Sequence, residues 1–124
     1  MTKTVLVVED DKNIQELLRL AMYNEGYEVI IVNNGFEALA YLEKQQPDLL
    51  ITDIMMPELD GIKLMKALQF REETKDIPLI IVSAKDSVPD ILKGLESGAR
   101  FYFTKPLKIN ELLAHIKFLL KMSA

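Results

Sequence analysis

The chain has 124 residues, no cysteine, and 15 Lys and Arg against 19 Asp and Glu, which gives a formal net charge of −4. The length suits one domain with a sizeable core, and the lack of cysteine excludes a disulfide scaffold, a zinc–thiolate site and a cysteine nucleophile. Mild acidity argues against non-specific nucleic-acid binding, and no apolar run approaches membrane-spanning length. We therefore expect a cytoplasmic protein with no direct nucleic-acid or membrane partner.

The first half of the chain predicts three strands separated by two helices. Continuous, β-branched apolar runs are typical of parallel strands that are covered on both faces. The expected strands are Thr4–Val8, Glu28–Val32 and Leu49–Ile51. A helix is expected from about Lys12 to a stop at Gly26, because apolar residues recur there at helical spacing. A second helix follows the turn after the second strand and runs to about Lys44.

The second half continues the alternation with strands at Leu79–Val82 and Arg100–Phe103. Helices are expected before, between and after them, and Pro89 is tolerable only in the first turn of the middle one. The apolar stripe of the third helix comprises Ile62, Leu64, Met65, Leu68 and Phe70. The stripe of the fourth comprises Val88, Ile91, Leu92 and Leu95, and that of the last runs from Ile109 to Leu120.

Five alternations of strand and helix predict a doubly wound α/β domain with a parallel sheet. The chain contains no internal repeat, linker or low-complexity tract. We expect residues 1–124 to form this one domain, with no output domain in the chain. The order of the strands does not follow from the periodicity.

Polar side chains follow four of the five expected strands. Glu9 and Asp10 come after the first strand, Asp53 after the third, Ser83 after the fourth and Lys105 after the fifth. Because parallel strands end at the same edge of a sheet, where open α/β sheets bind ligands, we expect these groups to converge. An aspartate at one strand tip could merely cap a turn, but the whole set points to a site.

Three close carboxylates would repel one another by roughly 1–4 kcal/mol per pair unless a cation neutralises them. Oxygen-only ligands without His or Cys favour a hard cation, which predicts Mg²⁺, with Mn²⁺ as a substitute. A lysine beside a metal-bound carboxylate is suited to an anionic group. Carboxylate, Mg²⁺, lysine and hydroxyl together indicate phosphoryl transfer onto aspartate.

Over its whole length the sequence resembles the receiver domain of two-component response regulators. The motifs that carry the resemblance are Val7–Asp11, Asp53–Gly61, Val82–Ala84, Gly98–Ala99 and Tyr102–Pro106. The resemblance implies a flavodoxin-like strand order of 2-1-3-4-5. It also implies a signalling switch that is not a conventional enzyme but has self-phosphorylation and autodephosphorylation activity.

The resemblance implies roles for individual residues. Asp53 would accept a phosphoryl group from a phosphohistidine, and Lys105 would pair with its oxygens. Glu9, Asp10, Asp53 and the backbone carbonyl of Met55 would hold Mg²⁺.

Further roles concern the conformational switch and the phosphate lifetime. Ser83 would hydrogen-bond the phosphoryl group and move toward it, and Tyr102 would turn inward as the aromatic switch. Small Ala84 would leave the phosphate accessible, while Met55 and Lys85 would tune hydrolysis.

The implied partners are a histidine kinase or histidine phosphotransfer protein, docking near the first helix, and an unknown downstream effector protein. Family members with DNA-binding output often carry an acidic dimer pair where this chain has Arg100 and Phe101. We therefore expect a monomer or weak dimer, with Phe101, Tyr102 and Phe118 as an apolar surface for another partner.

Three rival interpretations stay open at this point. A phosphorylation-independent pseudo-receiver keeps the fold, although the complete polar set counts against it. A phosphatase that turns over phosphorylated metabolites needs a second acid as general acid–base, whereas Ile54 and Met55 follow Asp53. A flavin carrier is disfavoured because no Ser/Thr/Gly-rich loop follows the first strand.

Other polar and sulfur-containing residues have simpler interpretations. Asp11 is expected to cap the first helix, and Asp60 to belong to the turn before Gly61. His115 is expected on the surface of the last helix, away from the strand edge. The methionines expected to fill the core or the chain ends are Met22, Met65 and Met122.

Overall fold

A computed structural model describes residues 2–55 and 61–122. The strands of its single parallel sheet are β1 (Thr4–Val8), β2 (Glu28–Val32), β3 (Leu49–Thr52), β4 (Leu79–Ser83) and β5 (Phe101–Thr104). The helices are α1 (Lys12–Asn24), α2 (Gly35–Leu42), α3 (Gly61–Gln69), α4 (Val88–Glu96) and α5 (Ile109–Met122). The sheet order is β2-β1-β3-β4-β5, which confirms the doubly wound fold and its flavodoxin-like order. In the described ranges no helix is long and apolar enough to cross a membrane.

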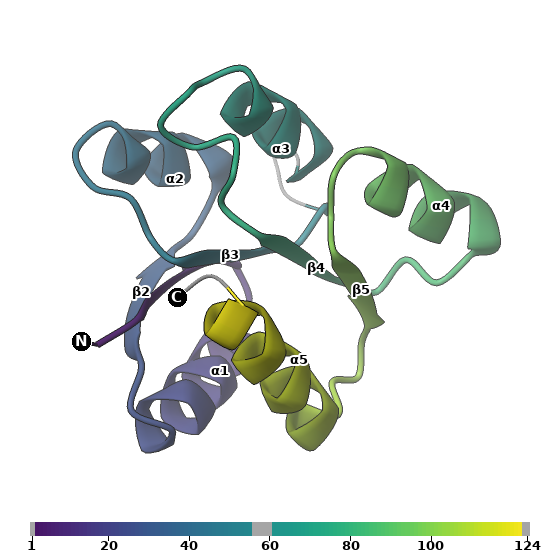
Figure 1. The fold of residues 1–124 in the computed structure, drawn as a ribbon. Helices are drawn as coiled ribbons and strands as arrows, with labels where there is room; N and C mark the ends of the chain where they lie inside the picture. Colours follow the sequence, from purple (N-terminus) through teal and green to yellow (C-terminus); the bar gives the residue numbers. More distant parts are fainter. Residues whose placement is uncertain (1, 56–60, 123–124) are drawn as a thin grey trace.

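The sheet lies between two helical layers. Figure 1 shows α1 and α5 on one face and α2, α3 and α4 on the other. Alternate side chains of the central strands point to opposite faces, so Leu6 and Leu50 pack toward α2 and α3, whereas Val7 and Ile51 pack toward α1 and α5. Burial on both faces explains why β1, β3 and β4 are continuous apolar runs.

Local signals fix the helix ends. Asp11 caps α1, since its side chain accepts hydrogen bonds from the backbone N–H groups of Asn13 and Ile14. That interaction confirms the expected role of Asp11. Ser87 caps α4, and Pro89 lies in the first turn, where its missing N–H costs nothing.

The core confirms some apolar predictions and corrects others. Met22 and Met65 are fully buried, as expected. Phe70, predicted to face the core, lies just beyond the end of α3 and is 89% exposed. Asp60 and its predicted turn lie outside the described residues, as does the side chain of Met122.

The apolar stripe predicted for α4 also differs from the structure. Val88, Leu92 and Leu95 are exposed, and only Gly94 of this helix is buried. The spacing of these apolar residues correctly predicts a helix. It does not indicate whether the sheet or some other surface covers them. Gly94 sits so close to Tyr102 that an added Cβ would lie 2.9 Å from its ring.

Candidate functional site

The parallel sheet gathers four of the predicted polar residues at the carboxyl ends of its strands. Glu9 follows β1, Asp53 follows β3, Ser83 ends β4 and Lys105 follows β5. Backbone hydrogen bonds fix their places: the Asp53 N–H donates to the Val8 carbonyl at 3.1 Å, and the Lys105 N–H donates to the Ser83 carbonyl at 2.8 Å. Glu9, Asp53 and Ser83 are all buried. A buried polar group at a strand end is costly unless it is paired, so its contacts are informative.

Lys105 joins the two buried carboxylates. Its Nζ lies 2.7 Å from Glu9 Oε1 and 2.9 Å from Asp53 Oδ2. The second oxygen of each carboxylate accepts a backbone N–H, from Asp11 to Glu9 Oε2 at 3.0 Å and from Met55 to Asp53 Oδ1 at 2.8 Å. Every carboxylate oxygen therefore has a donor, and the side chain of Asp53 is held in one orientation.

The electrostatics of the cluster follow from burial and pairing. Burial raises the pKa of Glu9, although Lys105 and the Asp11 N–H act in the opposite direction. Burial alone would lower the pKa of Lys105, but its hydrogen bonds and attraction to Glu9 and Asp53 outweigh it and raise the pKa. Lys105 is consequently an ammonium at neutral pH, and its charge is shared by two carboxylates.

The predicted trio of close carboxylates is only partly present. The Asp10 side chain is exposed, and no group of three acidic or imidazole side chains in residues 2–55 and 61–122 is close enough to hold a metal ion. Mutual repulsion explains the arrangement, because Lys105 neutralises two carboxylates and leaves the third in water. The donors are nevertheless oxygens only, and Asp10 directly adjoins Glu9, so the set fits a hard cation.

The residues predicted to form the switch lie beside this cluster. The hydroxyl of Ser83 accepts a hydrogen bond from the Lys85 N–H at 3.1 Å, and the Tyr102 hydroxyl donates to the Lys85 carbonyl at 2.7 Å. Burial raises the pKa of Tyr102. Ala84, Lys85 and Met55, the residues predicted to tune hydrolysis, are exposed.

One buried contact near the acidic residues was missed by sequence reasoning. The Gln15 side chain on α1 is 6% exposed, and its Nε2 donates to the Glu9 carbonyl and, at 2.8 Å, to Asn33 Oδ1. Lys12 Nζ donates to the same Asn33 oxygen at 2.9 Å. The sequence signal that could have revealed this contact is the position of Gln15, a polar residue on the helix face that carries buried Leu18 and Met22.

His115 takes no part in the site but is not a simple surface residue. It is half-buried, and its ring makes edge contacts with Phe101 and Phe103 at centroid distances of 4.5 and 5.0 Å. Its Nδ1 lies 2.7 Å from the Glu111 carbonyl oxygen. His115 is thus partly exposed on α5, and its ring also belongs to an aromatic cluster between β5 and α5.

Gly61 keeps the backbone of the site in place, and its replacement has a predictable cost. An added Cβ would lie 2.5 Å from the Asp53 carbonyl oxygen and 2.9 Å from Ile54 Cα, so the backbone must move. We expect Gly61→Ala to lower the free energy of unfolding by about 1–3 kcal/mol. Urea unfolding followed by circular dichroism measures this change. Exposed Lys66→Ala on the same helix is the control, and equal stability of the two variants would contradict the close approach.

A parallel α/β sheet with a buried aspartate, an acidic neighbour and a lysine at its carboxyl edge defines a class of phosphoacceptor folds. The chain belongs to the response regulator receiver domain family, because the model of that family matches residues 5–117. Membership of this family places the chain in two-component signal transduction.

Individual relatives agree with this assignment. The chain is 40% identical over 117 residues to the response regulator MprA of Mycobacterium leprae. The matched region covers 94% of this chain and 50% of that protein. The receiver domain of Francisella response regulator 1452 is 36% identical with a TM-score of 0.92, covering 99% of this chain and 100% of that one. The chain spans about half the length of the curated relatives it matches.

A third neighbour bears on the metal. The receiver domain of the sensor histidine kinase PA1611 from Pseudomonas aeruginosa PAO1 is 26% identical with a TM-score of 0.89, covering 98% of this chain and 99% of that one. That crystal structure has a magnesium ion coordinated in the active-site cleft.

Proposed function

We propose that Asp53 accepts a phosphoryl group from the phosphohistidine of a histidine kinase or a histidine phosphotransfer protein. The observation that carries this proposal is the buried Asp53 carboxylate, fixed at the end of β3 by the Lys105 ammonium and the Met55 N–H. In the step, an Asp53 oxygen attacks phosphorus, the new P–O bond forms, and the P–N bond to the donor breaks. The departing imidazole keeps the bonding electron pair and takes up a proton from water.

Glu9, Asp10, Asp53 and the backbone carbonyl of Met55 would hold Mg²⁺, for which Mn²⁺ would substitute. The fit rests on the all-oxygen donor set and on the exposed Asp10 carboxylate beside buried Glu9. When bound, the ion would neutralise negative charge on the transferring group. Lys105, which contacts both carboxylates, would then be free to pair with the phosphoryl oxygens.

The switch would be a population shift. Ser83 would leave Lys85 and hydrogen-bond the phosphoryl group, and Tyr102 would release the Lys85 carbonyl and turn inward. Moving a 1:99 equilibrium to 99:1 takes about 5.5 kcal/mol, more than one charge-assisted bond of roughly 1.5–3 kcal/mol supplies. A downstream effector protein would therefore complete the shift.

The phosphate lifetime would be set at the mouth of the site. Met55, Ala84 and Lys85 are exposed, and as residues that flank the phosphate they would govern the approach of water during autodephosphorylation through their size and charge. The chain would act as a monomer or weak dimer. A pseudo-receiver that is never phosphorylated gains no support, because Glu9, Asp53, Ser83 and Lys105 are all present at the strand ends.

The proposal predicts self-phosphorylation. We expect the wild-type chain to gain one phosphoryl group, measured as intact mass, after incubation with Mg²⁺ and a small-molecule phosphodonor such as acetyl phosphate. Mn²⁺ should support the gain, and a chelator should abolish it, because the donor group carries negative charge that the carboxylates alone would repel. After donor removal the adduct should decay by autodephosphorylation. An equal gain in the chelator would contradict the metal-dependent mechanism.

A further inference from the structure

A second surface lies at the other edge of the sheet, where α3 and α4 end. The side chain of Gln69, the last residue of α3, donates a hydrogen bond at 2.7 Å to the carbonyl of Ser97, the residue just after α4. This bond holds the two helix ends together. Side chains from these ends and from the segments just beyond them form what we call the basic–aromatic surface. Its residues are Lys66, Phe70, Arg71, Lys93 and Arg100.

Phe70 is the anchor of this surface. Its 89% exposure is the highest among the exposed large hydrophobic side chains of the described residues, ahead of Tyr23 at 73%. A phenyl ring in water forgoes the favourable free energy that burial of such a side chain provides. Aromatic side chains and arginine are both enriched at the centres of protein interfaces.

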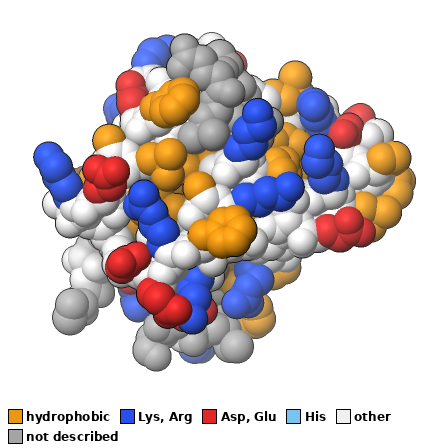
Figure 2. All heavy atoms as spheres, turned by 90° about the horizontal axis from the view of Figure 1, so that it is seen from above, with side chains coloured by type: hydrophobic (Ala, Val, Ile, Leu, Met, Phe, Trp, Pro, Cys, Tyr) orange, Lys and Arg blue, Asp and Glu red, His pale blue; other side chains and the backbone are white. Residues whose placement is uncertain are grey.

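Within the part of the chain that the structure describes, the cations of the basic–aromatic surface have no carboxylate partners of their own. Lys66, Arg71, Lys93 and Arg100 are exposed, and none of them forms a salt bridge with any other described residue. Figure 2 shows Lys and Arg side chains gathered over the α3–α4 face, with most Asp and Glu side chains nearer its rim. The four exposed cations of this surface contrast with the net charge of −4 that the whole chain carries.

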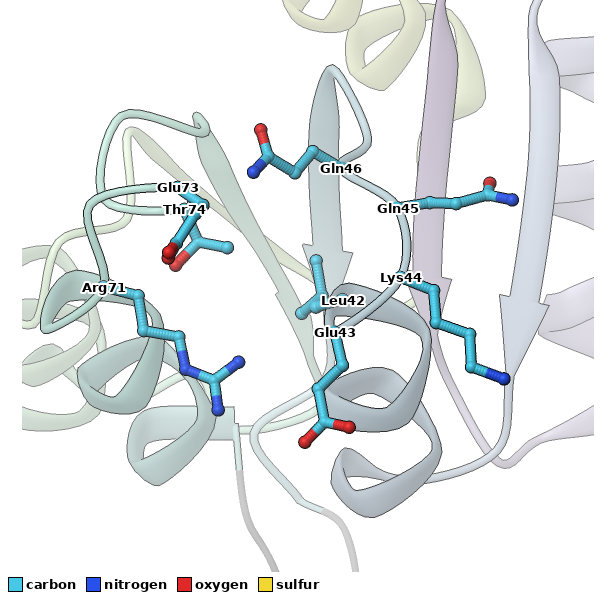
Figure 3. A pocket seen from close by; sticks show the side chains of 8 residues that line it. All are labelled: Leu42, Glu43, Lys44, Gln45, Gln46, Arg71, Glu73 and Thr74. Carbon is cyan, nitrogen blue, oxygen red and sulfur yellow. The ribbon is translucent and has the colours of Figure 1, made fainter.

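The surface continues into a shallow hollow. A cavity of about 560 Å³ lies between the α2–β3 loop and the α3–β4 loop, and Arg71, Glu43 and Gln46 are among its lining residues. Figure 3 shows the Arg71 side chain reaching into this hollow, whereas Lys44 points away from it. Glu43 and Glu73 also line the hollow, so the acidic part of a segment that crosses Phe70 would end at the Arg71 guanidinium rather than continue into the hollow.

We propose that the basic–aromatic surface docks an acidic segment of a protein partner. Carboxylates of the segment would pair with Arg71, Arg100 and the two lysines, and an apolar side chain would cover Phe70. Nucleic acid fits less well, because exposed Glu73 and Glu96 adjoin the cations and would repel a continuous phosphate backbone. Separate carboxylates on a peptide can avoid these two residues.

The surface is remote from the proposed phosphoacceptor site. Helices α3 and α4 end where β4 and β5 begin, whereas Asp53 and Lys105 follow the opposite ends of their strands. A segment docked on Phe70 would leave the approach to Asp53 open. The inference therefore goes beyond the proposed function and does not depend on it.

Fluorescence anisotropy with a short labelled peptide of Glu, Asp and Leu tests the proposal on the whole chain. We expect saturable binding that weakens as salt rises, and no binding of a matched peptide in which Lys replaces the acids. Phe70→Ala, Arg71→Glu and Arg100→Glu should each weaken binding by about tenfold or more, which is ~1.4 kcal/mol or more. Phe36→Ala and Lys121→Glu, which change an exposed ring and an exposed cation elsewhere, should bind as wild type does.

Circular dichroism confirms that each variant is folded before binding is measured. The proposal is overturned if the acidic peptide does not bind, or if it binds Phe70→Ala and Arg71→Glu as tightly as wild type. It is equally overturned if a short mixed-sequence DNA duplex binds more tightly than the peptide and loses affinity with the same variants. A Phe70-dependent dimer that excludes the peptide, seen by sedimentation, would assign the surface to a second copy of the chain instead.

Discussion

Asp53→Asn is expected to abolish phosphoryl uptake while leaving the fold intact. An amide is not a nucleophile toward phosphorus, so we expect uptake from acetyl phosphate to fall below detection. Asparagine nearly matches aspartate in shape, and its carbonyl oxygen can still accept the Met55 N–H. Lys105 keeps its ion pair with Glu9 in this variant. Intact-mass time courses and thermal melts measure the two properties separately.

The matched control for this variant is Asp76→Asn, an exposed carboxylate in the loop before β4. It should take up phosphoryl groups at the wild-type rate. If Asp53→Asn did so too, the nucleophile would have to be sought elsewhere in the chain. If Asp53→Asn failed to fold, the loss of uptake would not bear on chemistry, which is why the melt accompanies the time course.

Lys105→Met is expected to have the second-largest effect, since it removes the charge shared by two buried carboxylates. Loss of a positioned donor of this kind typically slows a reaction by about 10²–10³-fold. We therefore expect slow but measurable uptake at Asp53, in contrast to the complete loss in Asp53→Asn. Exposed Lys108→Met, three residues further on, is the control and should react at the wild-type rate. Unchanged uptake in Lys105→Met would contradict its proposed role.

The same variant should lose stability in a pH-dependent way. Burial raises the pKa of Glu9, and Lys105 acts against that shift, so its removal raises the pKa further. An acid with a higher pKa in the folded state binds protons more tightly there, so folding loses stability as pH rises through that pKa. In a chelator, Lys105→Met should therefore be destabilised relative to wild type more at about pH 8 than at about pH 5. Urea unfolding at both values measures this, and a larger loss at the lower pH would contradict it.

The fold was largely predictable because its signals are local. Continuous runs such as Leu49–Ile51 are apolar since both sheet faces are covered, and Asp11 begins a helix through contacts with the next two or three residues. The same local signals could not say what an apolar residue faces. Phe70 and Leu92 followed helical spacing, yet no sheet or helix in the described part of the chain buries them.

The sequence predicts which residues form the site better than it predicts how their side chains are arranged. Parallel topology brings Glu9, Asp53 and Lys105 to one edge whatever their separation in sequence, and 52 positions separate the Lys105–Asp53 pair. Which carboxylates the lysine pairs with depends on side-chain lengths and charge balance, so the exposure of Asp10 was not foreseen. The Gln15–Asn33 contact was missed because it joins residues 18 positions apart through amide groups that no periodicity marks.

The most direct test of the account is chemical trapping of the phosphorylated residue. Borohydride reduces an aspartyl phosphate to homoserine, so the phosphorylated chain can be reduced, digested and sequenced by mass spectrometry. The account predicts homoserine at position 53 only, dependent on Mg²⁺ and on the phosphodonor. Homoserine at another position, or a phosphate that survives borohydride on a different side chain, would contradict the assignment of Asp53 as the phosphoacceptor.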